Sequence, residues 1–533
     1  MKIYYNGPII TMEDDQIEAE VLIEQKGKIV YVGSKSGIAP YINDTVEWVD
    51  LSGNTLMPAF IDAHSHISDT ATLLKTADLS SAKNFTDIVT LLKSFINNND
   101  ISHQPFVVGM GYDHNSLEEH CHPDRHLLDP AFPDIPIMLV HASIHMGVAN
   151  ARMLEILNVT ADTPSPEGGI IARFDNSNEP NGYLEETAFN PAYDLILKEL
   201  ALTTDDIIKA EHLYIQNGIL TIQEGSTDYK TIELCRSVAD KHLLTCDLVA
   251  YPAFNFARGI GDSFERNADC IGTYKNHFKI GGYKIIGDGS PQGRTAWMTE
   301  PYEGTDDCSY AWVTDEEMQA YTDLAYSENR QVLCHCNGDA AAEQFLVACE
   351  HSEAKYPNRN LRPVMIHCQT VRDDQLERMA KINMIASIFV DHVYYWGDIH
   401  LKNFGPIRGH HISPAKSALD YGVSFNFHTD CPVVMPNLFQ TAWTAVNRIT
   451  KNGIVLGEDQ RIDVLNALKA LTINAAYLYF EENEKGSLKA GKNADLIIVD
   501  ENPLTIDPTR LKDIKVLYCY KNGVLVYSIE RNN

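Results

Sequence analysis

The apolar run Leu56-Met57-Pro58-Ala59-Phe60-Ile61 leads into Asp62-Ala63-His64-Ser65-His66, and this stretch predicts a strand that ends in a metal site. Side chains alternate along a strand, so His64 and His66 point to the same face and can bind one small cation. Two histidines at this spacing are also common as ordinary surface or core residues. The metal prediction therefore depends on where other polar side chains fall along the chain.

Seven further strands are predicted after this one, each an apolar, β-branched run followed by a helical stretch. They cover residues 219–223, 243–249, 280–286, 331–333, 363–366, 384–389 and 423–427. Eight strands that alternate with helices indicate an α/β fold of the closed (β/α)8 TIM-type barrel class. In such barrels the functional groups lie at the carboxyl ends of the strands.

Further metal-type side chains fall on these strands. Lys284 lies in the fourth strand, His335 ends the fifth and His367 ends the sixth. Asp430 follows the eighth strand. Together with the two histidines of the first strand, five potential ligands and one lysine are expected to meet at one rim of the barrel.

Local motifs around these residues resemble the amidohydrolase superfamily, and specifically its family 3, the branch of N-substituted formamide deformylases and YtcJ-like proteins. The motifs, in chain order over nearly the whole sequence, are Pro58-Ala59-Phe60-Ile61-Asp62-Ala63-His64-Ser65-His66, Tyr283-Lys284-Ile285-Ile286-Gly287-Asp288-Gly289-Ser290, His335-Cys336-Asn337-Gly338-Asp339-Ala340, Ile366-His367-Cys368-Gln369, His428-Thr429-Asp430-Cys431-Pro432-Val433 and Gly486-Ser487-Leu488.

The resemblance implies a site for one or two divalent ions, with zinc as the expected metal. His64, His66 and Asp430 would bind one ion. His335 and His367 would bind the other. Such an ion, with one position left open, lowers the pKa of bound water to about 7 and so makes hydroxide available at neutral pH.

Two residues of this rim have further expected roles. Lys284 stands where the superfamily places a bridging carbamate, so we expect it to be carboxylated by CO₂. The alternative is an unmodified amine paired with Asp288 or another acid. Asp430 is also the expected general base, which accepts the water proton and passes it to the departing amine.

Five other residues are candidates outside the metal ligands. His145 lies in a segment that resembles a family segment near the substrate, so it is a candidate for polarising the scissile carbonyl or binding the acyl group, with a structural role as the alternative. Tyr112, His114, Glu224 and Arg294 are candidate substrate contacts, each with packing or an ion pair as the alternative. Gly111-Tyr112 replaces the Gly-Trp more usual in the family, which puts any inherited substrate preference in doubt. Histidines 103, 120, 122, 410 and 411 lie off the strand ends and are interpreted as surface residues.

The ends of the chain are expected to form a second domain. Residues 1–57 and 481–533 each contain too few strand-like runs for a core of their own, so together they predict a small β-sandwich. Residues 58–480 would form the hydrolase barrel. About 150 residues separate its first two strands, far more than one βα unit needs, and predict an insertion at about 103–200.

Composition limits the kinds of partner. A formal net charge of −30 argues against nucleic acid or an anionic membrane surface, and leaves a small-molecule substrate. No apolar segment approaches the ~20 residues that span a bilayer, and the first residues do not read as a secretory signal. Eleven scattered cysteines favour reduced thiols in the cytoplasm. A homodimer is an expectation from the family alone.

The predicted function is a metal-dependent amidohydrolase that cleaves a carbon–nitrogen bond other than a peptide bond. The expected substrate is a linear N-formyl or N-acyl amine. A cyclic-amide hydrolase or a deaminase is the alternative, because the same metal rim serves those reactions. A non-catalytic binding protein on the same barrel is a further alternative, which the loss of a ligand would favour. All the ligand positions are present.

Overall fold

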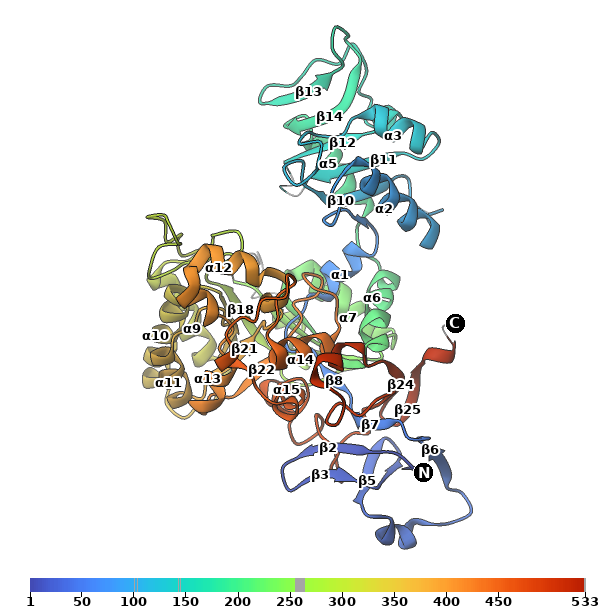
Figure 1. Ribbon diagram of the computed structural model, residues 1–533, viewed down its shortest axis with the longest axis vertical. Helices are drawn as coiled ribbons and strands as arrows, with labels where there is room; N and C mark the ends of the chain where they lie inside the picture. The colour runs from blue at the N-terminus through green and yellow to red at the C-terminus, as the bar shows by residue number, and fades with distance from the viewer. Residues whose placement is uncertain (100, 103, 142, 144, 255–263, 532–533) are drawn as a thin grey trace. The chain divides into compact units, whose positions relative to one another are not determined.

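The computed structural model describes residues 1–531 apart from 100, 103, 142, 144 and 255–263 (Figure 1). Two compact units divide the chain. One consists of residues 1–68 and 207–533, and the other of residues 69–206. The second unit lies where the sequence predicts an insertion, and the predicted domain bounds themselves stay a prediction.

The parallel strands of the first unit form two sheets, with the orders β17-β16-β15-β8 and β18-β19-β20-β21-β22. Their bounds are Phe60–Ile61 (β8), Ile219–Thr227 (β15), Asp247–Pro252 (β16), Phe278–Ile280 (β17), Gly282–Ile286 (β18), Gln331–Cys336 (β19), Val364–His367 (β20), Ile385–Ile388 (β21) and Phe425–Phe427 (β22). All eight predicted strands are therefore present, and the fourth is divided at Gly281. A Cβ there would lie 2.4 Å from the Tyr251 ring, so this junction requires glycine.

The two sheets share one apolar core. Ile61 and Val249 of the first sheet belong to the same buried cluster as Leu333, Ile366 and Ile385 of the second. Among the described residues no pairing of β22 with β8 is found. The α/β class is confirmed, and the closure of the barrel stays a prediction.

Helices follow the strands of both sheets along the chain. They include α7 (Tyr229–Asp240), α9 (Asp315–Ser327), α10 (Asp339–Lys355), α11 (Asp373–Lys381), α12 (His392–His410), α14 (Leu438–Asn447), α15 (Val464–Ala470) and α16 (Ile473–Leu478). Helix α9 begins with a capping box, in which the side chains of Thr314 and Glu317 each accept the other's backbone N–H. Among the described helices, none is both long and apolar enough to span a membrane.

Both ends of the chain contribute to one sheet of the first unit. Its order is β25-β24-β23-β7-β2-β3, and a smaller sheet has the order β5-β4-β1-β6. The bounds are Lys2–Tyr5 (β1), Ile9–Glu13 (β2), Gln16–Ala19 (β3), Val21–Gln25 (β4), Lys28–Gly33 (β5), Glu47–Asp50 (β6), Thr55–Pro58 (β7), Leu496–Val499 (β23), Val516–Lys521 (β24) and Val524–Ser528 (β25). Tyr4 and Leu22 share a core cluster with Leu56 and Leu496. The sandwich arrangement of these sheets stays a prediction.

The run 56–61, taken as one strand in the sequence, is two strands in the structure. Its first half belongs to β7 and pairs with β23, whereas only Phe60 and Ile61 form β8. Leu56, Met57 and Ile61 are all buried. An apolar run is equally compatible with two different buried sheets, so the sequence pattern cannot show the change of sheet.

The second unit is built on one six-stranded sheet with the order β13-β14-β12-β11-β10-β9. Its strands are Ala77–Asp78 (β9), Val107–Tyr112 (β10), Ile137–His141 (β11), Met146–Ala149 (β12), Gly169–Arg173 (β13) and Pro180–Glu186 (β14). The helices Phe85–Asn98 (α2), Arg125–Ala131 (α3), Ala151–Ile156 (α4) and Asn190–Glu199 (α5) complete it. Successive residues of β10 point to opposite faces of the sheet and enter two separate core clusters. Val107 belongs to one cluster and Val108 to the other, as expected for a sheet covered on both faces.

Candidate metal centre

The six predicted ligands meet in the first unit, and we call them the His64 cluster: His64, His66, Lys284, His335, His367 and Asp430. His64 Nε2 lies 3.1 Å from Lys284 Nζ and 3.6 Å from Asp430 Oδ1. His66 Nε2 lies 3.2 Å from the same Asp430 oxygen. The two histidines at the end of β8 therefore face residues of β18 and of the segment after β22.

The remaining histidines complete the group. The rings of His335 and His367 have centroids 4.4 Å apart, and those of His64 and His367 are 5.7 Å apart. One donor atom from each of His64, His367 and Asp430 lies within 4.8 Å of the other two. Side chains from five strands thus come within reach of one another.

The orientation of the His64 ring is set by Gln223 of β15. Gln223 Nε2 donates to the Ala63 carbonyl oxygen and to the Tyr479 hydroxyl, at 2.8 and 3.0 Å, so its Oε1 faces His64 Nδ1. Nδ1 must then carry the proton. This leaves the lone pair of Nε2 directed at Lys284 and Asp430, the arrangement that a metal-binding imidazole needs.

Asp288 plays the same part for His335. Its Oδ1 lies 3.1 Å from His335 Nδ1. Backbone N–H groups of Trp297, Asn337 and Gly338 donate to its two oxygens at 2.7–3.0 Å. The carboxylate is therefore engaged by His335 and the backbone.

Burial sets the charges of the cluster. It lowers the pKa of His64 and of His367 well below the usual value for an imidazole, and it lowers the pKa of Lys284 to about 8. Burial would raise the pKa of Asp430, but the hydrogen bond and the charge of His66 hold it below its usual value. Neutral imidazoles, such as those of His64 and His367, beside an ionised carboxylate are the donor set that Zn²⁺ prefers.

Asp430 is held in place by contacts between its loop and the loop after β8. Its N–H donates to the His64 carbonyl oxygen at 3.0 Å, and the His66 N–H donates to the Cys431 carbonyl oxygen at 2.8 Å. Asp62 accepts the backbone N–H and the hydroxyl of Thr429 at 3.1 and 2.5 Å. These contacts join the segment after β8 to the segment after β22.

His428 belongs beside this cluster, although the sequence reasoning assigned it no role. Its ring centroid lies 5.3 Å from that of His64, and its Nε2 lies 3.3 Å from His367 Nδ1. Its Nδ1 lies 2.9 Å from the Ser387 hydroxyl. The sequence contained a pattern that could have identified His428. It is separated from Asp430 by one residue, the same i, i+2 spacing as that of His64 and His66.

Of the other predicted site residues, Glu224 adjoins the cluster through an isolated antiparallel bridge with His66, and three lie in the second unit. Glu224 is buried, and its Oε2 accepts the Ser68 N–H at 2.9 Å, at the start of α1 (Ile67–Leu73). Arg294 is exposed and donates to Asn403 Oδ1 at 2.9 Å. His145, Tyr112 and His114 lie in the second unit, where exposed His145 is 3.2 Å from Glu186 Oε2.

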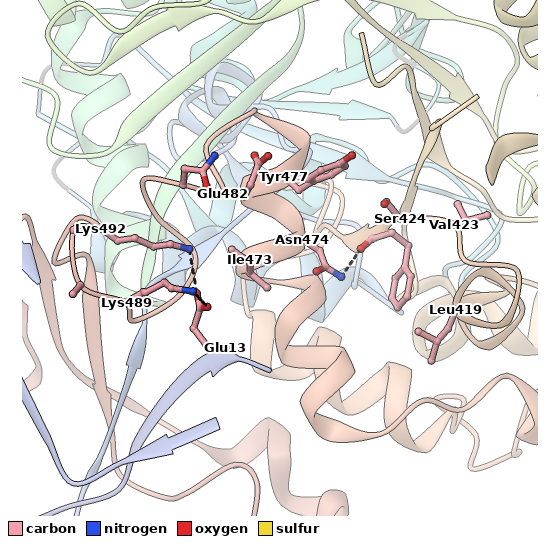
Figure 2. Close-up of a pocket in the computed structure, with 14 residues that line it drawn as sticks. Glu13, Leu419, Val423, Ser424, Ile473, Asn474, Tyr477, Glu482, Lys489 and Lys492 are labelled. Carbon is pink, nitrogen blue, oxygen red and sulfur yellow. Dashed lines mark hydrogen bonds and ion pairs between the residues drawn. The ribbon is translucent and has the colours of Figure 1, made fainter. Parts of the chain in front are cut away.

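A pocket of about 650 Å³ lies away from the metal ligands (Figure 2). Val423 and Ser424, just before β22, line it, so it opens near the opposite end of the strand from Asp430. Figure 2 shows Lys489 and Lys492 directed at Glu13, with nitrogen–oxygen distances of 2.6 and 3.4 Å. The cations of this pocket are thus already paired.

Comparison with known proteins gives a consistent result. The sequence model of the amidohydrolase family matches residues 47–527. The putative amidohydrolase YtcJ of Bacillus subtilis is 26% identical, over 98% of this chain and 99% of its own. N-substituted formamide deformylase of Arthrobacter pascens is 27% identical, over 98% of this chain and 97% of its own.

A solved structure agrees with both. An uncharacterized metal-dependent hydrolase from Pyrococcus horikoshii has a TM-score of 0.74 and 26% identity, over 95% of this chain and 99% of its own. The resemblance inferred from the motifs is confirmed. This chain is therefore a member of the amidohydrolase family, a hydrolase that acts on carbon–nitrogen bonds.

Proposed function

We propose that this enzyme hydrolyses a linear N-formyl or N-acyl amine at a divalent-metal site formed by the His64 cluster, at the mouth of a (β/α)8 barrel. The observation that carries the proposal is the convergence of five ligand-type side chains and Lys284 from five strands or the segments that follow them. The formamide deformylase of Arthrobacter pascens, alike over nearly its whole length, supports the choice of a small N-formyl amine.

The residues suit zinc, held as two ions. His64, His66 and Asp430 would hold one ion and His335 and His367 the other, with Lys284, carboxylated by CO₂, between them. The second nitrogen of two of these imidazoles is already hydrogen-bonded to Gln223 or Asp288, which orients the ligating nitrogen. When bound, the ions would lower the pKa of a water and polarise the substrate carbonyl.

The protein's own groups would move the proton. Asp430 is ionised, and it would accept a proton from the attacking water as the new carbon–oxygen bond forms. It would then give that proton to the nitrogen as the carbon–nitrogen bond breaks, which releases the amine and the formate or other acid. His66, 3.2 Å from the Asp430 carboxylate, would keep it oriented between the two steps.

Several roles outside the cluster remain predictions. The assignment of His145 to the carbonyl, and of Tyr112, His114, Glu224 and Arg294 to the substrate, has no part in this proposal. A deaminase remains the alternative within the same chemistry, and it differs in one product. It would release ammonia rather than a substituted amine.

The test combines a metal count with product analysis. Zinc per chain is measured by elemental mass spectrometry for the wild type and for His64→Asn, His66→Asn, both purified without chelators. N-formyl and N-acyl amines are then screened for amine release. We expect the variant to lose two ions and all activity, and the metal-free wild type to regain activity faster when bicarbonate accompanies zinc.

Each contrary result has a distinct meaning. A loss of one ion, with no bicarbonate effect, would replace the two-ion arrangement by one ion and an unmodified Lys284. Release of ammonia from amino-substituted rings would favour the deaminase. An unchanged ion count in the variant would overturn the metal site itself.

A further inference from the structure

A second group of metal-type side chains lies in the unit of residues 69–206, at the ends of two neighbouring parallel strands. Tyr112 at the end of β10 is opposite His141 at the end of β11. Asp113 and His114 follow Tyr112 directly. Parallel strands end at the same edge of a sheet, so the side chains of Asp113, His114 and His141 lie close together. We call these three residues the His114 cluster.

The donor atoms of this cluster form a compact triangle. His114 Nδ1 lies 3.1 Å from His141 Nε2, and Asp113 Oδ1 lies 3.4 Å from His141 Nε2 and 3.8 Å from His114 Nδ1. A tetrahedral ion with bonds of about 2.0–2.1 Å separates its ligand atoms by about 3.3–3.4 Å. The triangle therefore has nearly the size of one face of such a site.

Neighbouring residues hold the two rings. The His114 ring is stacked on His122, with centroids 4.0 Å apart, and His122 Nδ1 lies 3.0 Å from the Tyr112 hydroxyl. His141 Nδ1 accepts the Ser143 N–H at 3.0 Å, so the ring of His141 carries its proton on Nε2 in this structure. A cation bound at Nε2 would move that proton to Nδ1, which lies 2.9 Å from the Ser143 hydroxyl that could then accept it. The sequence had assigned His122 to a surface loop, and it instead packs against this cluster.

The donors differ in exposure. The side chain of His141 is 9% exposed, that of His114 28% and that of Asp113 39%. The cluster is thus anchored on a buried histidine and open to solvent on the side of the carboxylate. Two imidazoles and one carboxylate with an open position form a donor set used by Zn²⁺ and other first-row divalent ions.

We propose that Asp113, His114 and His141 bind one divalent transition-metal ion of the Zn²⁺ class, independent of the metal centre in the other unit. The ion would join the end of β10 to the end of β11. This gives His114 a role different from the substrate contact that the sequence predicted. The competing arrangement is a hydrogen-bond network alone, in which Ser143 N–H donates to His141 Nδ1 at 3.0 Å and His141 Nε2–H donates to Asp113.

The experiment uses the full-length chain with His64→Asn and His66→Asn, so that the other centre contributes fewer ions. Zinc is added to the chelator-treated protein, and the bound ions are counted by elemental mass spectrometry after gel filtration. His114→Gln or Asp113→Asn is then added to this background. The matched control is His126→Gln, since His126 lies in the same unit with its side chain 78% exposed.

We expect His114→Gln and Asp113→Asn each to lose one further ion per chain, and His126→Gln to lose none. Co²⁺ added to the wild type should give a visible absorption band, part of which Asp113→Asn removes. Hydrogen exchange over residues 107–112 and 137–141 shows whether each variant keeps its fold. Equal ion counts with and without His114, or an equal loss in His126→Gln, would overturn the proposal.

Discussion

The His64 side chain is 1% exposed, whereas that of His114 in the other cluster is 28% exposed. The ligands of the first cluster come from five strands, and those of the second from two adjacent strand ends. Gln223 and Asp288, both fully buried, orient the imidazoles of His64 and His335 through hydrogen bonds. The His114 cluster is supported by the Ser143 hydroxyl and by the stacked ring of His122. Water can take the place of the hydroxyl as a hydrogen-bond partner. We therefore expect the His64 cluster to bind its ions more tightly and to exchange them more slowly.

The largest effect is expected for Asp430→Asn, which tests whether the buried cluster is catalytic. Asparagine keeps the size of the side chain but cannot accept the proton, so kcat for an N-formyl amine should fall by about 10²–10⁴-fold. Zinc content and the pH profile of kcat are measured beside it. An activity near that of the wild type would remove Asp430 from the proton transfer.

A pH effect on stability is expected in the first unit through Glu211 of α6 (Thr204–Gln216). Burial raises the pKa of Glu211 from 4.5 to about 7, while the N–H groups of Cys246 and Thr245 oppose this shift. A raised pKa favours the folded state below pH 4.5, and that contribution is lost as the pH rises through about 7. The loss amounts to up to about 3 kcal/mol.

Glu211→Gln should therefore flatten the dependence of unfolding temperature on pH between 4.5 and 8. Glu316→Gln, at the exposed start of α9, is the control and should behave as the wild type does. Calorimetry of the three proteins makes the comparison. Identical pH curves for wild type and Glu211→Gln would contradict the assignment.

The smallest effects test the supporting hydrogen bonds of the two clusters directly. Gln223→Leu removes the acceptor from His64 Nδ1, and zinc affinity of that centre should fall by about 10–100-fold. Gln223→Glu keeps an acceptor for Nδ1 but loses the donor to the Ala63 carbonyl oxygen, so it should restore only part of the affinity. Ser143→Ala in the open cluster should cost less than about tenfold, because water can take the place of the hydroxyl. Competition with a zinc chelator measures all three, and equal losses in both clusters would refute the contrast.

The sequence predicted the strands, and which polar side chains would lie together at their ends, because both depend on local patterns. Apolar runs located the strands, and polar residues at their ends located His335, His367 and Asp430. The supporting residues were not predictable in this way. Gln223 and Asp62 act on partners that are 159 and 367 positions away in the chain, and no local pattern records such a pairing.

In the second unit, too, a tertiary contact was not predictable from the local sequence pattern. His122 lies off any strand end, so periodicity assigned it to the surface, while the structure stacks it on His114. The boundary within the run 56–61 was hidden for a related reason. Burial in either of two sheets requires the same apolar residues, and only the tertiary pairing distinguishes them.

Strand β7 has a consequence for synthesis of the chain on the ribosome. Its partner β23 pairs Pro58 with Leu496, residues that are 438 positions apart. At about 5–20 residues per second, the second strand emerges about 20–90 s after the first. During that time one edge of β7, including buried Leu56, has no native partner and is open to other nascent chains. Newly made protein is therefore expected to need a chaperone until β23 has left the exit tunnel, and truncation just before β23 should yield aggregates rather than a smaller enzyme.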